Sequence, residues 1–274
     1  MRSALNIRVK YSIKKISLNL LYMLLSNAKL KYLMSLKTTK MRQKYSVFIV
    51  EGEKMAQEVL TYKSIEIETI CALETWIQTN GFILKPFFNK IITVSESELK
   101  QISNLTTPNK VLIIAKIPPP QYDDALIQKS FSIYLDGIQD PGNMGTIMRI
   151  ADWFSMPYIF CSKTCVHVWQ PKVIQASMGA FLRVQATEMN FFDLKKRYPN
   201  LPTFAAILRG DNIFENNTFP KHGIIIIGNE GSGISENIIS EADFKITIPG
   251  GGGAESLNAA VSIGIIAATL IHKK

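Results

Sequence analysis

Short apolar runs alternate with segments of helical periodicity along most of the chain. Apolar runs bounded by turn residues predict buried strands, whereas apolar positions repeated every three or four residues predict helices. Residues 24–42 have helical spacing, Gly81 is expected to close a later helix, and Ser95 with Glu98 to cap another. In this half the pattern predicts strands at 45–50, 65–71, 91–94 and 111–116, and helices at 54–62, 73–80 and 95–102.

A second series of strands and helices follows the proline run at 118–120, which predicts a stiff linker. Strands that alternate with helices favour a mostly parallel sheet covered on both faces. The sequence therefore predicts an α/β protein with a smaller first unit and a larger second one. In the second unit, the expected strands are 131–135, 158–161, 181–184, 203–208 and two that include Ile224 and Phe244, and the expected helices are 144–154, 170–178, 191–198 and 257–271.

Two glycine-rich loops follow the last two expected strands, at 228–233 and 250–253. Glycines at the C-terminal ends of parallel strands let the main chain approach a ligand closely, and ligands bind at those ends in open α/β sheets. The spacing excludes a dinucleotide fingerprint, which needs glycine where Glu255 stands, and a P-loop, which needs Gly-Lys-Ser/Thr. Two tight turns are the alternative, but the polar residues Glu230, Ser256 and Asn258 favour a binding site.

The net charge of +9 is unevenly placed along the chain. The first acidic residue is Glu51, and eleven basic residues precede it. Residues 1–50 therefore carry +11 and the remainder −2. A basic arm on a near-neutral body is typical of a protein that binds a polyanion. For residues 1–22, a solvated basic face or a start codon assigned too early are alternatives.

The three cysteines form no disulfide framework, which indicates a reducing compartment. Cys161, Cys165 and His167 are close in sequence, but no fourth ligand follows at a standard spacing, so no metal is expected. An apolar stretch at 16–25 lacks a signal-peptide cleavage site, and no run of eighteen apolar residues exists. The sequence thus predicts a cytoplasmic protein with no membrane segment.

Three spaced segments carry a resemblance to a known family. Together, residues 135–149, 227–235 and 248–258 resemble the three motifs of the SpoU (TrmH-type) family of RNA ribose 2′-O-methyltransferases, in the SPOUT superfamily. Residues 170–180 resemble the family's linking segment. Residues 48–54 resemble part of the small substrate-binding domain of these enzymes, which is related to an RNA-binding ribosomal protein.

The resemblance implies an architecture that the strand pattern alone does not show. The C-terminal domain is expected to form a deep trefoil knot, a rare exception to unknotted topology, and to bind S-adenosylmethionine in its knotted loops. A homodimer through the C-terminal domain is also implied. The expected division is a basic extension at 1–22, an RNA-binding domain at 23–117, a proline-rich linker at 118–128 and a catalytic domain at 129–274.

The family's functional residues map onto two sets of positions in this chain. One departure is Gly250, which stands with three more glycines where the family has a bulkier residue, and it predicts weaker cofactor binding. The expected main-chain contacts to the cofactor are Gly210, Gly228, Ile248 and Leu257. The expected catalytic set is Asn143, Arg149, Glu230, Ser256 and Asn258.

Each polar residue of this set has a structural alternative. Asn143 or Ser256 could cap a helix, Arg149 could form a surface ion pair, and Glu230 could close a turn. The alternative is weakest for Asn258, which is expected one turn inside an apolar helix, where burying an unpaired amide is costly.

A ribose 2′-hydroxyl is a weak nucleophile near neutral pH, so the loss of its proton must be assisted. All three histidines lie outside the three motifs. Arg149 is left to orient the hydroxyl or a phosphate, and a guanidinium that stays protonated favours electrostatic activation over base catalysis. Ribosomal RNA is the preferred substrate, with transfer RNA second. A catalytically silent RNA-binding assembly factor is the alternative from another class, and the complete polar set favours the enzyme.

Overall fold

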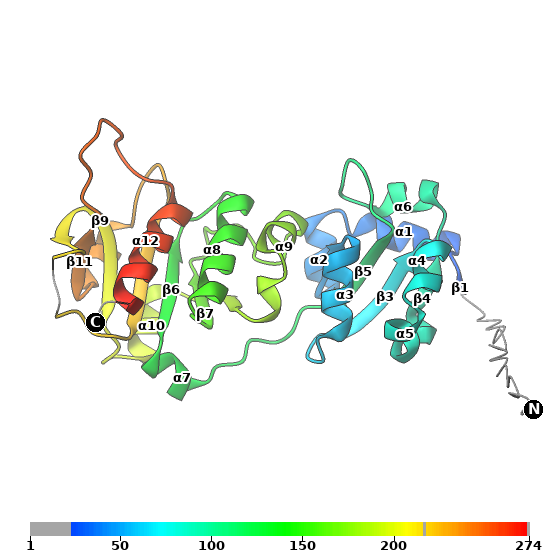
Figure 1. The fold of residues 1–274 in the computed structure, drawn as a ribbon, viewed down its shortest axis with the longest axis horizontal. Coiled ribbons are helices and arrows are strands. Elements are labelled where there is room, and N and C mark those ends of the chain that lie inside the picture. The colour runs from blue at the N-terminus through cyan, green and yellow to red at the C-terminus, as the bar shows by residue number, and fades with distance from the viewer. Residues whose placement is uncertain (1–22, 216–217, 273–274) are drawn as a thin grey trace, which may run out of the picture.

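The computed structural model of the 274-residue chain describes residues 23–215 and 218–272. They form two sheets, one from each half of the chain, at opposite ends of an elongated molecule (Figure 1). The basic extension expected at residues 1–22 lies outside the described residues. No described helix combines the length and the apolar character needed to cross a bilayer.

The N-terminal half forms a mixed five-stranded sheet with the order β1-β4-β3-β5-β2. β5 runs antiparallel to both of its neighbours, and the remaining pairs are parallel. The strands are β1 (Met23–Leu24), β2 (Val47–Glu51), β3 (Ile67–Ala72), β4 (Ile91–Thr93) and β5 (Val111–Lys116). The helices are α1 (Asn27–Ser35), α2 (Thr39–Tyr45), α3 (Glu53–Thr61), α4 (Glu74–Thr79), α5 (Gly81–Leu84), the 3-10 helix η1 (Lys85–Lys90) and α6 (Glu96–Ile102).

Several details of this half differ from the expectation, and β1, α5 and η1 were not predicted. The single helical segment at 24–42 is two helices, because the buried Arg42 side chain donates hydrogen bonds to the Leu36 and Lys37 carbonyls, both at 2.8 Å, where α1 has ended. Gly81 begins α5 rather than closing a helix. The capping box of Ser95 and Glu98 on α6 is confirmed.

The C-terminal half forms a six-stranded sheet with the order β11-β9-β10-β6-β7-β8, and every pair is parallel, as predicted. The strands are β6 (Phe131–Asp136), β7 (Tyr158–Cys161), β8 (Gln185–Glu188), β9 (Thr203–Asn212), β10 (Gly223–Gly228) and β11 (Phe244–Thr247). The helices are α7 (Asp124–Lys129), α8 (Pro141–Trp153), α9 (Pro171–Ser177), η2 (Ala180–Leu182, a 3-10 helix), α10 (Phe191–Arg197), α11 (Glu236–Glu241) and α12 (Ala259–His272).

Alternate residues of the central strands enter two separate cores, which shows that both faces of this sheet are covered. Ile225 and Ile227 of β10 pack in the core that includes residues of α8, α9 and α12. Ile224 and Ile226 pack in the core that includes residues of α7, α10 and α11. A strand places successive side chains on opposite faces, so an unbroken run of isoleucines can supply both cores.

Two strand predictions in this half were wrong in position or length. The apolar run at 181–184 overlaps η2, and the strand follows at β8, because a short buried apolar run does not distinguish a helical turn from a strand. β9 extends through Gly210 instead of ending before it. Its pairing with β11 shifts between Lys245 and Ile246, so residues 206–210 bulge out of the ladder.

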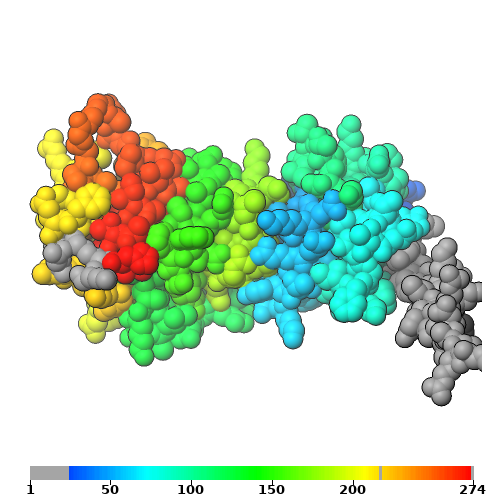
Figure 2. Space-filling view, viewed as in Figure 1, coloured from blue at the N-terminus to red at the C-terminus, as the bar shows by residue number. Residues whose placement is uncertain are grey.

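The two halves meet through a packed junction that fixes the site's surroundings. The Phe48 ring of β2 packs against the rings of Trp169 and Phe181, with centroids 4.7 and 5.7 Å apart. Arg183 forms ion pairs with Glu58 of α3 at 2.6 Å and with Asp152 of α8 at 2.9 Å. Figure 2 shows atoms of both halves in contact across this junction.

Candidate active site

The candidate site lies at the edge of the parallel sheet where β6, β10 and β11 end. β10 pairs with β6 along its whole length, and Gly228 lies opposite Asp136. β9 separates β10 from β11 in the sheet. The loops that leave these strands carry the three motifs, and parallel strands bring such loops to one edge.

Asp136 and Asn229 hold the first two loops together. The Asp136 carboxylate is buried and accepts hydrogen bonds from the Ser235 N–H at 2.8 Å and the Ser235 hydroxyl at 2.6 Å. The Asn229 amide donates to the Gly137 carbonyl at 2.8 Å. Sequence reasoning missed both residues, although a polar side chain directly after a buried strand was the available signal.

Asn143 is the centre of a hydrogen-bonded chain of three predicted site residues. Its amide nitrogen donates to the Glu230 carboxylate, and its oxygen accepts from the Asn258 amide at 2.9 Å. One residue comes from each motif. The carboxylate on one side and the amide on the other fix which way the Asn143 amide points, because its nitrogen can only donate and its oxygen only accept.

Asp140 caps α8, so the capping alternative for Asn143 is wrong. The Asp140 carboxylate accepts from the Asn143 N–H at 2.7 Å, and Pro141 occupies the first helical turn, where its missing N–H costs nothing. Asn143 therefore lies inside the first turn of the helix. Its side chain is left free to reach across to the other two motifs.

Asn258 caps α12, which corrects two expectations at once. Its side-chain oxygen accepts from the Ala260 N–H at 2.9 Å and the Val261 N–H at 3.3 Å. It is therefore at the start of the helix and exposed, not buried one turn inside it, and Ser256 is not the cap. The helix begins at Ala259 instead of the expected residue 257.

Arg149 and Ser256 stand outside this chain of hydrogen bonds. The exposed Arg149 side chain leaves α8 six residues after Asn143 and has no ion-pair or hydrogen-bond partner in the described part of the chain. Ser256 is exposed in the segment between β11 and α12, which arches away from the sheet (Figure 1).

Three of the four expected cofactor positions lie at the ends of adjacent strands. Gly228 ends β10, Gly210 lies near the end of β9, and Ile248 directly follows β11. A Cβ on Gly228 would overlap the backbone of Gly233, so the chain can double back there only with glycine. Leu257 lies apart from them, with 47% of its surface exposed.

These positions fit a nucleoside cofactor. The main chain at three neighbouring strand ends supplies hydrogen-bonding groups at one edge of the sheet. The bulge of β9 leaves the Leu208 side chain 74% exposed. The Thr247 hydroxyl of β11 donates to the Leu208 carbonyl at 3.2 Å, which holds the bulge beside β11. Exposed apolar side chains next to open main chain suit a ligand with an apolar ring and polar edges.

The possible metal ligands do not form a metal site. Among the described residues, no three His, Cys, Asp or Glu side chains lie close enough together to hold an ion. The thiols of Cys161 and Cys165 instead interact with each other, which raises the pKa of Cys161 and lowers the pKa of Cys165 to about 7. Cys165 lies beside the start of the first motif, where its thiol donates to the Leu135 carbonyl at 3.3 Å.

Comparison with known proteins agrees with this geometry. Residues 130–268 match the SpoU rRNA Methylase family, and residues 27–113 match the MRM3-like substrate binding domain. The chain belongs to the SpoU rRNA methylase family. The predicted family, the α/β fold class and the enzyme class, an S-adenosylmethionine-dependent RNA methyltransferase, are thereby confirmed. The trefoil knot follows from the family fold.

Individual relatives cover nearly the whole chain. The 23S rRNA (guanosine(2553)-2′-O)-methyltransferase RlmP of Bacillus subtilis is 25% identical, over 88% of this chain and 94% of its own. A TrmH-family structure from Porphyromonas gingivalis superposes with a TM-score of 0.81 at 32% identity, covering 91% and 99% of the two chains. The AdoMet-bound rRNA methyltransferase of Sinorhizobium meliloti has the same fold, with a TM-score of 0.79 at 23% identity over 89% and 94%.

Proposed function

We propose that this enzyme transfers the methyl group of S-adenosylmethionine to a ribose 2′-hydroxyl of large-subunit ribosomal RNA. The observation that carries the proposal is the hydrogen-bonded chain from Asn258 through Asn143 to Glu230, which joins all three motifs at the open edge of the sheet. The name of the Bacillus subtilis relative supports both the 2′-hydroxyl and the ribosomal RNA.

The cofactor-binding role is proposed for the main chain at Gly210, Gly228, Ile248 and Leu257. When bound, S-adenosylmethionine supplies an activated methyl group on a sulfonium. The protein holds the reacting groups in line and excludes water, which is where most of its contribution to the rate lies. Residues 250–253 are all exposed glycines, and ordering them costs roughly 1–2 kcal/mol each, so cofactor binding weaker than micromolar is expected.

The catalytic role is proposed for Arg149 with Asn143, Glu230, Ser256 and Asn258. Arg149 has the one exposed guanidinium on α8, and without a protein partner among the described residues it is available to the substrate. Its charge can stabilise the oxyanion that forms as the 2′-hydroxyl loses its proton. Asn143 and Glu230 position the ribose, and Ser256, in the segment between β11 and α12, contacts the same nucleotide.

Three further parts of the proposal concern partners and location. The domain at 23–117 and the basic residues at 1–22 bind the RNA. Dimerisation is proposed through α12 and α8, which pack together and leave Val261 50% and Trp153 83% exposed. The cytoplasmic location is supported by cysteines that are free of disulfides.

The test is methyl transfer from radiolabelled S-adenosylmethionine to large-subunit ribosomal RNA from a strain that lacks the gene. The proposal expects label in that RNA and none in RNA from the parent strain, where the position is already filled. Label in transfer RNA alone would show that transfer RNA, and not ribosomal RNA, is the substrate. No label in either RNA, together with tight RNA binding, would instead indicate a catalytically silent assembly factor.

A further inference from the structure

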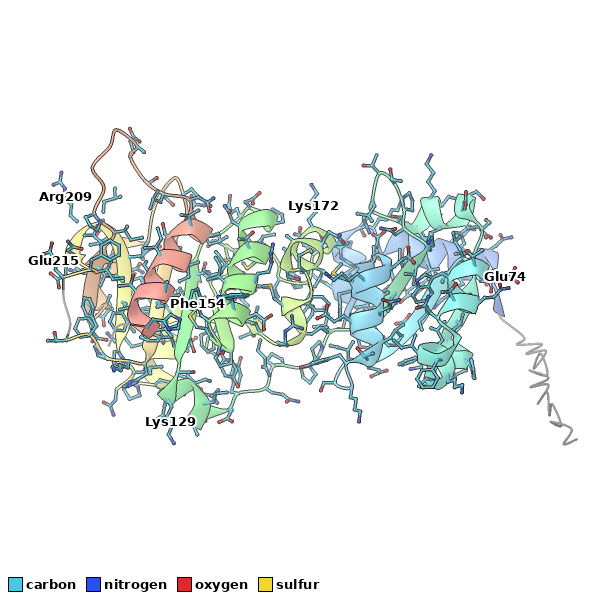
Figure 3. The ribbon with its side chains drawn as sticks, in the orientation of Figure 1. Glu74, Lys129, Phe154, Lys172, Arg209 and Glu215 are labelled. Atoms are coloured by element: carbon cyan, nitrogen blue, oxygen red, sulfur yellow. The ribbon has the colours of Figure 1, made fainter. Side chains whose placement is uncertain are left out.

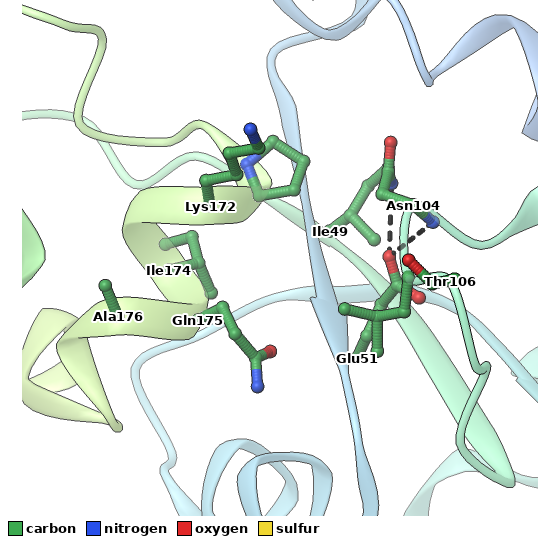
Figure 4. Close-up of a pocket in the computed structure, with 10 residues that line it drawn as sticks. Ile49, Glu51, Asn104, Thr106, Lys172, Ile174, Gln175 and Ala176 are labelled. Carbon is green, nitrogen blue, oxygen red and sulfur yellow. Dashed lines mark hydrogen bonds between the residues drawn. The ribbon is translucent and has the colours of Figure 1, made fainter. Parts of the chain in front are cut away.

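A pocket of about 320 Å³ lies between the substrate-binding half and the catalytic half (Figure 4). On one side it is lined by the end of β2 and the loop that joins α6 to β5. On the other side it is lined by α9. The pocket therefore opens between two parts of the chain that come from different halves of the fold.

One wall of the pocket is held in place by a buried carboxylate. Glu51, only 6% exposed, accepts hydrogen bonds from the Ser103 hydroxyl, from the Asn104 N–H at 2.9 Å and from the Asn104 amide at 3.1 Å. Three donors satisfy the buried charge and fix residues 103–104 against β2. The wall is therefore preformed, and the Asn104 side-chain oxygen is left without a protein partner among the described residues.

The opposite wall and the rim carry polar side chains that form no hydrogen bond or ion pair with the described part of the protein. Gln175 and Lys172 of α9 are exposed, and Figure 4 shows both across the pocket from Glu51 and Asn104. The Thr106 hydroxyl at the rim likewise has no protein partner in the described part of the chain. Between these groups the half-buried Leu105, Pro171 and Ala176 contribute apolar surface, and the buried Ile49 and Ile174 form the floor.

The packed helices α8 and α9 connect the pocket to the proposed site of methyl transfer: α9 lines the pocket, and α8 carries Asn143 on the side turned away from α9. Ala176 lines the pocket and also packs against Gly145, where an added Cβ would overlap the Ala176 side chain. Gly145 is two residues after Asn143 on α8. Lys172 extends outward on the side of the molecule that also carries the segment between β11 and α12 (Figure 3). RNA that has its ribose at Asn143 and runs along this side of the molecule toward the substrate-binding half would pass the pocket.

From this arrangement we propose that the pocket binds an unstacked nucleobase of the substrate RNA, at a nucleotide other than the methylated one. The inference rests on the proposed function. Apolar side chains cover the two faces of the base, the Asn104 oxygen, the Gln175 amide and the Thr106 hydroxyl bond its edge, and Lys172 contacts the adjoining phosphate. Sequence-specific RNA recognition uses unstacked bases in this way, and the volume is at the small end of ligand pockets, as a single base requires.

The test fills the pocket without touching Asn143 or its partners. Thr106→Trp places an indole in the opening, and Thr107→Trp, at the neighbouring exposed loop position that does not line the pocket, is its control. With unmethylated large-subunit ribosomal RNA, Thr106→Trp should lower the methylation rate at limiting RNA by about tenfold or more, and Thr107→Trp should not. Binding of S-adenosylhomocysteine should stay the same in both variants.

A second variant, Gln175→Ala, tests the pocket independently in case Thr106→Trp does not fold. Gln175→Ala should raise KM for the RNA about three- to tenfold with little change in kcat, as loss of one hydrogen bond to a base predicts, whereas Gln128→Ala on the exposed face of α7 should change neither. Ultraviolet cross-linking of the same RNA, transcribed with 4-thiouridine, should mark peptides from residues 103–110 or 171–178 in the wild type and not in Thr106→Trp.

The outcomes separate the two hypotheses. A wild-type enzyme that methylates the RNA, with equal rates for Thr106→Trp and Thr107→Trp and no cross-link in those peptides, overturns the nucleobase pocket alone. A wild-type protein that neither binds nor methylates the RNA overturns the proposed function, and the pocket inference with it.

Discussion

The side-chain amide of Asn143 donates a hydrogen bond to the carboxylate of Glu230, a residue 87 positions further along the chain. This contact joins the helix after β6 to the loop after β10. Asn258 completes it from the start of α12. The three motifs are thus held as one unit by side chains, in addition to the pairing of their strands.

Removing the Glu230 carboxylate should release Asn143. Glu230→Ala should lower turnover by about a hundredfold, because a misplacement of about 1 Å in a positioning group costs that much. Glu230→Gln retains an oxygen that can accept from Asn143 and should keep more of the rate. Single-turnover methylation measures the effect, with S-adenosylhomocysteine binding as the control. Equal rates for Glu230→Ala and wild type would remove Glu230 from the site.

Two substitutions at Asn258 separate its structural role from its role in the site. Asn258→Ala should destabilise the fold by about 1 kcal/mol, since α12 loses its cap, and should also reduce turnover. Asn258→Ser can still cap the helix, but its hydroxyl is one bond shorter than the amide and does not reach Asn143, so this variant should keep the stability and lose activity. Thermal melts and single-turnover rates are the measurements. If Asn258→Ser were fully active, the contact to Asn143 would have no catalytic importance.

Replacing Gly228 or Gly251 by alanine should have different effects on the stability of the fold. Gly228→Ala forces the loop away from Gly233 and should cost about 1–3 kcal/mol of folding free energy. A Cβ at Gly251 meets nothing within 4 Å, and Gly251→Ala should be neutral or raise stability by about 0.4–1 kcal/mol. Urea denaturation compares the two. A neutral Gly228→Ala would show that the loop does not double back as described.

Cys165 should be the reactive thiol of the protein. The neighbouring Cys161 thiol favours the Cys165 thiolate and lowers the pKa of Cys165 to about 7, so alkylation by iodoacetamide should rise through that pH. Cys71 is buried, its pKa is raised to about 12, and it should stay unmodified in the folded protein. Mass spectrometry of the alkylated peptides reads out both. An alkylation midpoint near the ordinary thiol pKa, about 8.5, would contradict the thiol pair.

The apolar pattern predicted most of the fold because buried strands leave a strong local signal. The four β-branched isoleucines at 224–227 favour a strand, and the apolar runs before residues 228 and 250 correctly put both glycine loops after strands. The pattern could not distinguish a 3-10 turn from a strand at 181–184, because that run is buried in either form. It also missed the bulge of β9, which depends on pairing with β11 far away in sequence.

The sequence predicted which residues form the candidate site better than it predicted how they contact one another. Sequence spacing selected Asn143, Glu230 and Asn258, and the structure brings them into contact. It could not show that Asp140 caps α8, since two capping residues stand close together and only the helix start decides between them. Asp136 and Asn229 were missed because the groups that they bond, in Ser235 and Gly137, lie far from them in sequence.

The central claim is methyl transfer to a ribose hydroxyl with the help of Arg149. The most direct measurement is single-turnover methylation of unmethylated large-subunit ribosomal RNA, followed by complete digestion to nucleosides. We expect the label in one 2′-O-methylnucleoside, and a rate about 10²–10⁴ lower for Arg149→Ala at unchanged S-adenosylhomocysteine affinity. Label on a base, or a wild-type rate from Arg149→Ala, would contradict the account.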